Sequence, residues 1–130
     1  MTRKRLSLGK AGEELALTYL QGLGYKILAR NYRKPFGEVD IIANDGGTLV
    51  FVEVKTRVGT GFGPPFESVT PRKQLQMSKV ALEYIGRHGM TERPARFDVV
   101  GILFAAAGSP VAMAPQVELL KNAFDLCYGV

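Results

Sequence analysis

Apolar residues recur every three or four positions over residues 7–23, which is the spacing of one face of an α-helix. The stripe consists of Leu8, Ala11, Leu15, Tyr19 and Leu23. Gly24 should end this helix. Because successive helical residues turn by about 100°, Glu14 should point away from the stripe into solvent, whereas Glu13 should lie on its flank. Glu13 can therefore reach the edge of a buried surface.

A second helix is predicted over residues 71–87. Thr70 suits the N-cap because its hydroxyl can accept a backbone N–H, and Pro71 suits the first helical position because its φ is already helical. The buried side of this helix should be formed by Leu75, Val80, Leu82 and Ile85.

Five further segments have the alternation or the short apolar runs that are typical of strands. They span residues 25–31, 38–43, 48–55, 96–104 and 116–124. Residues 44–47, with the sequence Asn-Asp-Gly-Gly, predict a turn that joins the second and third segments into a hairpin, because these residue types tolerate positive φ. The order helix, three strands, helix, two strands predicts an α/β fold in which helices flank a central mixed sheet, within a single domain of residues 1–130.

Basic residues outnumber acidic ones by 17 to 12, which gives a formal net charge of +5. The excess is concentrated in residues 1–34, which hold eight Lys or Arg and two Glu. Such an excess suits a polyanionic partner such as nucleic acid, because Lys and Arg displace counterions from phosphates. Ordinary solubility is the alternative explanation.

The sequence also bears on the cellular location. The basic N-terminus lacks the apolar run of a secretory signal, and the longest apolar stretch, residues 99–107, is too short to cross a membrane. The single cysteine excludes an intrachain disulfide and fits a reducing compartment. We therefore expect a cytoplasmic protein without a membrane partner.

Charged residues interrupt the two apolar strands of the predicted hairpin. They are Glu38, Asp40, Glu53 and Lys55. Alternation places Glu53 and Lys55 on one face of their strand. A four-residue turn sets Asp40 opposite Phe51 and Glu38 opposite Glu53, which makes Asp40 and Glu53 diagonal neighbours on one face. A register shifted by two residues would place them directly opposite each other.

Carboxylates gathered on an apolar sheet repel one another and are costly to desolvate, so a cation must offset them. Lys55 is one candidate. A divalent metal is the other, and Mg²⁺ suits this role because it accepts one or two carboxylates, keeps waters and takes further ligands from substrate phosphate. The simpler alternative is a solvated ion pair between Glu53 and Lys55, but the flanking strands are too apolar for an ordinary pair of this kind.

The arrangement of Asp40, twelve further residues and then Glu53-Val54-Lys55 resembles the PD-(D/E)XK signature of restriction-endonuclease-like nucleases, with Val39 where proline is frequent. In that superfamily the Asp and the Glu hold a catalytic Mg²⁺ and the Lys serves the attacking water. The resemblance therefore implies a restriction-endonuclease-like fold, Asp40 and Glu53 as ligands of Mg²⁺ or Mn²⁺, and Lys55 as the residue that positions water.

The resemblance extends to the first helix. Archaeal Holliday-junction resolvases of the same superfamily carry a further metal-site Glu on their first helix, followed by a Gly and an aromatic residue that opens a strand. Glu13, followed by Gly24 and Tyr25, is similar. Glu13 is therefore implied to complete or support the metal site.

A closer resemblance covers nearly the whole chain. The segments GKAGEELALTYL, GYKILARNYR, GEVDIIANDGGTLVFVEVKTR, ESVTPRKQ and RFDVVGI are similar, in this order, to the blocks of the YraN family of predicted endonuclease-like bacterial proteins. We thus expect a metal-dependent endonuclease that hydrolyses phosphodiester bonds in DNA, with branched or structured DNA favoured by similarity to the resolvases. Resolvases that cut two strands act as dimers, so a homodimer formed through a strand edge or through residues 111–113 is a further expectation.

Several other polar residues are candidate contacts for nucleic acid, because they flank the predicted site or begin the second helix. They are Arg30, Arg33, Arg57, Lys73 and Gln74. Glu38 is either a further metal ligand or a partner of Arg57.

Two other classes of function stay open at this point. A nucleic-acid-binding module could keep the fold and the basic charge without cleaving, although the intact set of Asp40, Glu53 and Lys55 argues against it. An accessory subunit could carry a purely structural acidic cluster. In that case the removal of Asp40 or Glu53 would leave partner binding intact and relieve charge repulsion.

Overall fold

The computed structural model describes residues 2–59, 69–105 and 114–127, with side chains from residue 8 onward. The candidate pairing segment 111–113 lies outside these residues. The elements are α1 (Thr2–Gly22), β1 (Lys26–Lys34), β2 (Gly37–Asp45), β3 (Thr48–Gly59), α2 (Pro71–Arg87), β4 (Ala95–Ala105) and β5 (Gln116–Phe124). This order confirms the predicted α-β-β-β-α-β-β arrangement.

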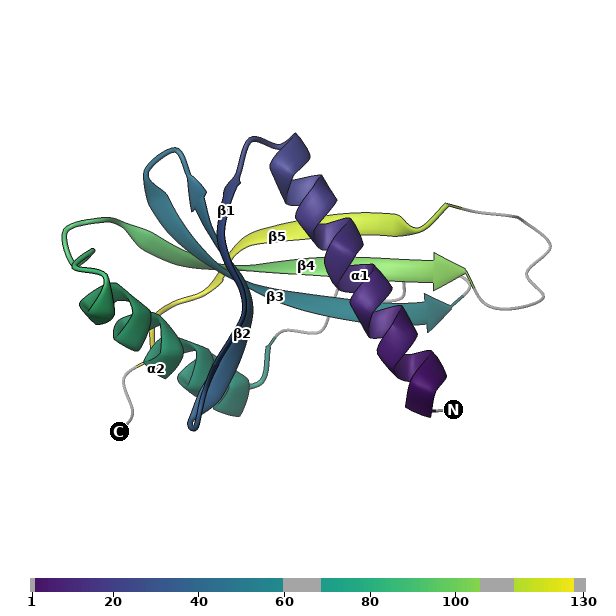
Figure 1. Ribbon diagram of the computed structural model, residues 1–130, viewed down its shortest axis with the longest axis horizontal. Coiled ribbons are helices and arrows are strands. Elements are labelled where there is room, and N and C mark those ends of the chain that lie inside the picture. Colours follow the sequence, from purple (N-terminus) through teal and green to yellow (C-terminus); the bar gives the residue numbers. More distant parts are fainter. Residues whose placement is uncertain (1, 60–68, 106–113, 128–130) are drawn as a thin grey trace.

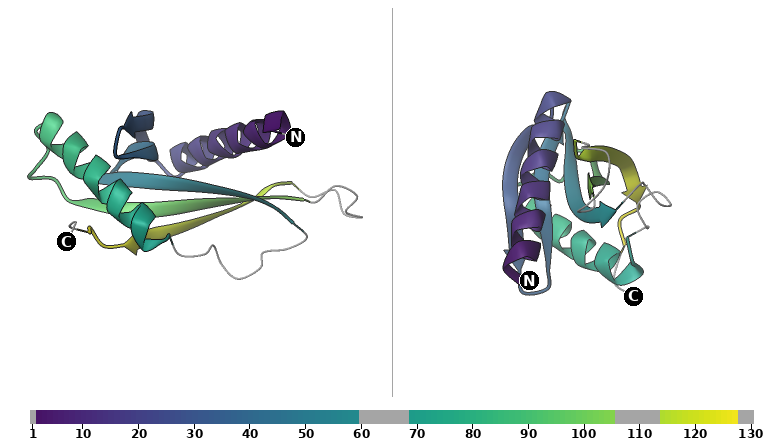
Figure 2. Two further views of the ribbon diagram at one scale, coloured as in Figure 1. Left: turned by 90° about the horizontal axis from the view of Figure 1, so that it is seen from below. Right: turned by 90° about the vertical axis from the view of Figure 1, so that its right-hand side faces the viewer.

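The five strands form one sheet in the order β1-β2-β3-β4-β5 (Figure 1). Neighbouring strands are antiparallel except β3 and β4, which are parallel and are connected through α2, as a parallel pair requires a long crossover. The sheet is therefore mixed, as predicted. The two helices pack on its opposite faces (Figure 2).

β3 is the middle strand, and its alternating side chains contribute to two separate apolar cores. The core under α1 includes Ala16, Leu20, Val50, Val52 and Ile102. The core under α2 includes Phe51, Met77, Val80, Phe97 and Val99. Both faces of β3 are thus covered over its first half, which is why this segment is almost continuously apolar.

The buried face of α1 differs from the predicted stripe, and the helix begins at Thr2 and not at residue 7. Its buried positions are Gly12, Ala16, Leu17 and Leu20. Leu15 packs against the core as predicted, but Ala11 and Leu23 are exposed, so the predicted stripe was only partly correct. Glu14 is exposed and Glu13 is partly buried, which confirms the predicted difference between them.

Close packing through Gly12 explains the rotation of α1. A Cβ atom added to Gly12 would lie 2.1 Å from the hydroxyl oxygen of Thr56 on β3. The helix therefore approaches β3 closely at Gly12, and the buried face that contains Gly12 also includes Leu17 and Leu20.

Gly12→Ala should lower the free energy of unfolding by about 1–3 kcal/mol, because the added methyl group forces α1 away from Thr56. Gly9→Ala is the matched control in the same helix, since no atom lies within 4 Å of its added Cβ. Alanine is the better helix former, so Gly9→Ala should raise stability by about 0.5–1 kcal/mol. Equal stability of the two variants in urea denaturation would contradict the packing at Gly12.

α2 begins and ends at the predicted residues. Its N-cap is Thr70, whose hydroxyl oxygen accepts the Lys73 N–H at 3.2 Å, and Pro71 occupies the first position. The cap fixes the direction of the first helical turn, which lies next to the site described below.

The buried residues of α2 only partly match the prediction. They are Met77, Ser78, Val80, Ala81 and Tyr84. The expected burial of Val80 is confirmed, but Leu82 is 43% exposed and its expected burial was wrong. The helix is rotated because Tyr84 packs edge-on against Phe51, with ring centroids 6.0 Å apart. Neither described helix is long and apolar enough to span a membrane.

The turn between β2 and β3 contains two residues, not four. Gly46 and Gly47 have φ values of 56° and 99°, and a two-residue turn of type I′ requires positive φ at both positions. Asp45 consequently pairs with Thr48. Asn44 and Asp45 belong to the strand and not to the turn.

This turn shifts the hairpin register by two residues. Ile42, and not Asp40, lies opposite Phe51, so the predicted pairs of Asp40 with Phe51 and of Glu38 with Glu53 were wrong. When the observed pairing is continued, Asp40 falls opposite Glu53, which is the alternative register. A shift of two leaves every side chain on its original face, so Asp40 and Glu53 still share a face.

Candidate active site

β2 and β3 separate where Asp40 and Glu53 meet. The antiparallel pairs end at Ile41 opposite Val52. Beyond that pair the Val54 N–H donates to Oδ2 of Asp40 at 2.8 Å. If the two strands stayed paired, this N–H would instead donate to a backbone carbonyl of β2. The Asp40 side chain thus ends the pairing of the two strands and is held in a fixed position by the backbone of β3.

Asp40 and Glu53 form a pair of carboxyl groups. Burial, followed by the negative charge of Glu53, raises the pKa of Asp40 to about 7, although the Val54 N–H opposes this shift. A hydrogen bond between the two side chains raises the pKa further, because it needs a proton on one of them. The pair therefore retains a proton near neutral pH, and a bound cation could replace that proton.

α2 brings a positive charge to this pair. Nζ of Lys73 lies 3.7 Å from Oε1 of Glu53, and both side chains are mostly buried. Lys73 belongs to the first turn of α2, where the helix dipole is positive and adds to the field at the carboxylates. The sequence indicated only a phosphate contact for Lys73. The ion pair was missed because it joins residues of two elements whose relative placement no local pattern reveals.

α1 places Glu13 within electrostatic range of Asp40. Burial raises the pKa of Glu13, and the negative charges of Asp40 and Glu38 raise it further. The close contact of α1 with β3 at Gly12 sets this position. Glu13 therefore belongs to the same electrostatic environment as the pair, and its role as a metal ligand stays a prediction.

Lys55 and Arg57 follow Glu53 at two-residue intervals on β3, so the three side chains point to the same face. Two residues along a strand correspond to about 6.6 Å. The partner of Lys55 on β4 is Gly101, which has no side chain to compete for the space above it. Lys55 thus lies on the same strand face as Glu53, and its role beside the carboxyl pair stays a prediction.

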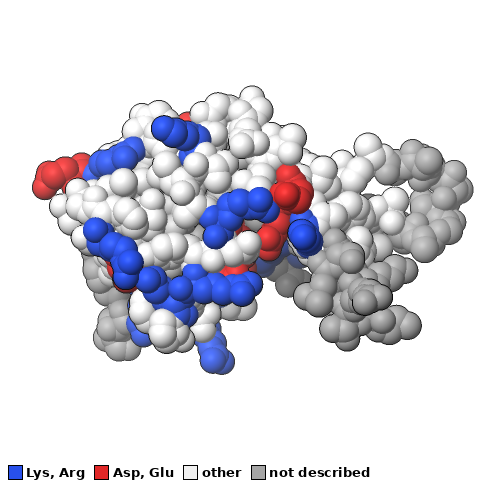
Figure 3. All heavy atoms as spheres, in the orientation of Figure 1, with Lys and Arg blue, Asp and Glu red and all other residues white. Residues whose placement is uncertain are grey.

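Two of the predicted phosphate contacts lie on the surface around the pair. Arg30 forms an ion pair of 2.9 Å with Glu14, and Arg33 forms one of 3.3 Å with Glu38. The partner of Glu38 in this ion pair is thus Arg33, where the sequence suggested Arg57. Figure 3 shows Lys and Arg side chains set around the acidic ones on the face that carries α1 and the β1–β2 hairpin.

Gln74 makes two hydrogen bonds that hold the start of α2 in place. Its amide nitrogen donates to the Val69 carbonyl at 2.7 Å, and its amide oxygen accepts from the Cys127 thiol at 3.6 Å. These contacts tie the start of α2 to the segment that follows β5. The structure therefore groups Gln74 with α2 packing and not with the carboxyl pair.

Within the described ranges, no three His, Cys, Asp or Glu side chains are close enough to hold a metal ion together. The candidate ligand set is therefore the pair of Asp40 and Glu53. Mg²⁺ and Mn²⁺ fit such a set, because these hard cations bind carboxylate oxygens and fill the remaining positions with water and phosphate.

A second polar cluster, away from this pair, joins β2, β4 and β5 to Tyr25, which directly precedes β1. Asp98 is fully buried and accepts hydrogen bonds from the Tyr25 hydroxyl, from the Arg96 guanidinium and from the Asn122 N–H. Arg96 also pairs with Asp45 at 2.7 Å. Arg96 and Asp98 thus form a structural ion pair of 3.0 Å within β4.

The fold and the site together define an α/β protein with a five-stranded mixed sheet, in which two strands diverge around a carboxyl pair. A family model described as Uncharacterised protein family UPF0102 matches residues 12–102, and the chain belongs to this family, the YraN family. The matched region contains both carboxylates, Lys55 and Lys73. The family predicted from the sequence is therefore confirmed.

Relatives of this family are similar to the chain over nearly its whole length. A UPF0102 protein of Geotalea daltonii is 52% identical over 122 residues, which cover 94% of this chain and 92% of the relative. A UPF0102 protein of Geobacter metallireducens is 48% identical over 128 residues, which cover 98% of this chain and all of the relative. One from Acidothermus cellulolyticus is 45% identical and covers 92% of this chain and 95% of its own length.

Proposed function

We propose that this protein is a metal-dependent endonuclease that hydrolyses phosphodiester bonds in DNA. The observation that carries the proposal is the carboxyl pair of Asp40 and Glu53, held at the divergence of two apolar strands with Lys55 on the same strand face. A protein gains no stability from two adjacent, partly buried carboxyl groups, because they repel each other and lose hydration. A cation held between them accounts for their position.

Each residue of the site then has a chemical role. Asp40 and Glu53 would hold Mg²⁺ or Mn²⁺. When bound, the ion would acidify a water molecule and neutralise charge on the scissile phosphate. Lys55 would orient the attacking water or accept its proton, and Lys73, freed from Glu53 by the ion, would contact a phosphate oxygen.

The surface around the pair supports a nucleic acid as the substrate. Arg30 and Arg33 of β1 and Arg57 of β3 would bind phosphates on either side of the cleaved bond. Contacts of this kind fix the substrate in position without reading its sequence. Affinity for DNA should therefore fall steeply as the salt concentration rises.

Lys55→Ala should reduce cleavage by about 100-fold or more, because the water loses the group that orients it or takes its proton. The measurement is the cleavage of labelled single-stranded, duplex, flap and four-way-junction DNA with Mg²⁺ or Mn²⁺. Lys79→Ala, which changes an exposed lysine of α2, is the matched control and should cleave normally.

The outcomes of this assay separate the candidate functions. Cleavage by the native protein that the chelator EDTA and Lys55→Ala both abolish supports the nuclease. Cleavage that persists in Lys55→Ala would point to a contaminating enzyme. DNA binding without cleavage by the native protein under any metal would replace the nuclease with a nucleic-acid-binding module.

A further inference from the structure

A groove of about 480 Å³ lies at the tip of the β1–β2 hairpin, next to the carboxyl pair. Residues 33–38 of the hairpin form one wall, and Lys73 and Gln76 of α2 form the other. The groove is lined mainly by polar atoms and is open to solvent. The hydrophobic pattern did not predict this surface, and the aromatic residue Phe36 between two strands was the signal for it.

The hairpin tip is held firmly against α2. A Cβ atom added to Gly37 would lie 3.1 Å from the side chain and the carbonyl oxygen of Gln76, so any larger residue would require Gln76 to move by a few tenths of an ångström. Nζ of Lys34 forms an ion pair of 3.1 Å with Glu83, which also accepts the Tyr32 hydroxyl. The groove is therefore a preformed feature of the surface.

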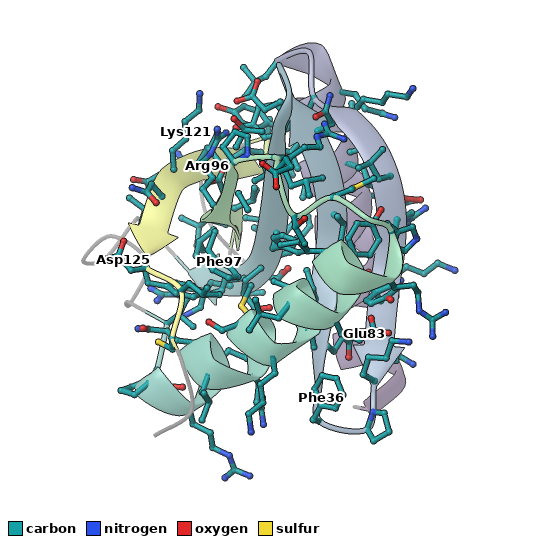
Figure 4. All side chains as sticks on the ribbon, turned by 90° about the vertical axis from the view of Figure 1, so that its left-hand side faces the viewer. Phe36, Glu83, Arg96, Phe97, Lys121 and Asp125 are labelled. Atoms are coloured by element: carbon teal, nitrogen blue, oxygen red, sulfur yellow. The ribbon has the colours of Figure 1, made fainter. Side chains whose placement is uncertain are left out.

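Phe36 is an aromatic side chain at the tip that the apolar cores do not use. It is 40% exposed, and Figure 4 shows its ring beside α2 at the end of the hairpin. Part of this ring is therefore in solvent and can contact a ligand. Such rings, set among cations, are the stacking surfaces on which proteins bind unpaired bases.

The charges around Phe36 suit a phosphate chain. Arg33, Lys34 and Lys73 line the groove, and Glu38 is the acidic residue among its lining. The side chain of Arg33 is 72% exposed although it pairs with Glu38, so its guanidinium group can also reach a ligand. Three cations and an aromatic ring can bind a strand through its backbone and one of its bases together.

The groove is continuous with the candidate active site. Lys73 lines it and also contacts Glu53, and Glu38 lies two residues from Asp40 along β2. Four residues of strand separate Phe36 from Asp40, which corresponds to about 13 Å. A strand whose phosphate reaches the carboxyl pair would therefore place a base on Phe36 only a few nucleotides away.

We propose that this groove binds an unpaired segment of the nucleic-acid substrate and that Phe36 stacks on one of its bases. The inference rests on the proposed function for the identity of the substrate. It adds the specificity: the protein prefers DNA that has an unpaired nucleotide beside the cleaved phosphate, because a base within a duplex cannot expose its face to Phe36.

The test is the binding of DNA that carries the fluorescent base 2-aminopurine. It is done with Ca²⁺ in place of Mg²⁺ so that binding is measured without cleavage. The probes are a single strand, a flapped duplex labelled at its first unpaired position, and a blunt duplex. Phe36→Ala should weaken binding to the first two about 5-fold to 100-fold and abolish the fluorescence change, with little effect on the duplex.

Two control variants make the result specific. Phe36→Tyr keeps a stacking ring and should bind as the native protein does. Leu120→Ala removes a similarly exposed apolar side chain from β5, at the opposite edge of the sheet, and should leave binding unchanged. If Phe36→Ala fails to fold, binding to all three probes will be weaker. In that case Phe36→Leu, which keeps a bulky side chain without a ring, must show weaker binding to the single strand and the flapped duplex but not to the blunt duplex.

Failure of this inference differs from failure of the proposed function. If Phe36→Ala and Phe36→Leu bind single-stranded and flapped DNA as tightly as the native protein, stacking on Phe36 is excluded while the nuclease stands. If the selective loss occurs but no metal supports cleavage, the groove is supported and the nuclease falls. If the native protein binds none of the probes, both are excluded.

Discussion

Asp40→Asn should abolish metal-dependent cleavage and at the same time stabilise the metal-free protein. Asparagine can still accept the Val54 N–H and can donate to Glu53, so the local structure should persist. It lacks the negative charge that a divalent ion requires. Loss of a residue that only hydrogen-bonds to a metal ligand already lowers metal affinity or activity by about 10-fold to 100-fold. Loss of the ligand itself should therefore reduce cleavage by more than about 100-fold.

The stability gain follows from the titration of Asp40. Its pKa is raised to about 7 in the folded protein, mainly by burial and then by Glu53, whereas an unfolded aspartate has a pKa of about 3.9. Between about pH 4 and pH 7 the folded state therefore binds more protons than the unfolded state. The free energy of unfolding of the metal-free protein should therefore fall as the pH rises from about 4 to about 7.

Asp40→Asn removes this loss and should be more stable than the native protein at pH 8 by up to about 4 kcal/mol, because one pKa unit corresponds to about 1.4 kcal/mol. The measurement is urea denaturation at a series of pH values in the presence of EDTA. Glu92→Gln, at an exposed position, should change neither stability nor cleavage noticeably. A native protein whose stability does not decline between pH 4 and 7 would contradict the raised pKa.

Asp98→Ala should lower the free energy of unfolding by about 3–5 kcal/mol, the largest loss of stability that we expect from one substitution. Asp98 is fully buried and neutralises Arg96, so its removal leaves a mostly buried guanidinium group with Asp45 as its remaining acidic partner. The Tyr25 hydroxyl and the Asn122 N–H also lose their acceptor.

The control for this prediction is Asp125→Ala, which removes an exposed carboxylate just after β5 (Figure 4). It should change stability by less than about 0.5 kcal/mol. Both variants are compared with the native protein by thermal and urea denaturation. Equal stability of Asp98→Ala and Asp125→Ala would show that the buried cluster does not stabilise the sheet.

Much of this fold was predictable because the hydrophobic pattern is strong and local. The period of α2, its capping residue Thr70 and its proline at the first position agree, so both of its ends were predicted correctly. β5 was predicted to the residue, and the other strands to within a few positions. The face shared by Asp40 and Glu53 also follows from alternation alone.

Features that depend on contacts between elements could not be predicted. Gly12 is invisible to a hydrophobic pattern, yet its contact with Thr56 decides which face of α1 is buried. The register of the β2–β3 hairpin was ambiguous because residues 44–47 are all good turn residues and a shift of two leaves the faces unchanged. Only the observed turn at Gly46 and Gly47 resolves it.

The same limit applied to the site. The motif indicated Asp40, Glu53 and Lys55, because acidic residues within buried strands stand out in the sequence. The contact of Lys73 with Glu53 and the groove beside Phe36 required the placement of α2 against the β1–β2 hairpin. The spacing of hydrophobic residues along the chain does not show how two elements are placed against each other.

The most direct test of the account is a calorimetric titration of the protein with Mn²⁺, comparing the native chain with Asp40→Asn and with Glu53→Gln. We expect one ion to bind per native chain, with release of a proton near pH 7, and at least a 10-fold loss of affinity in each variant. Both variants must be folded, which far-UV circular dichroism establishes. Unchanged Mn²⁺ affinity in Asp40→Asn would contradict the assignment of the carboxyl pair as the metal site.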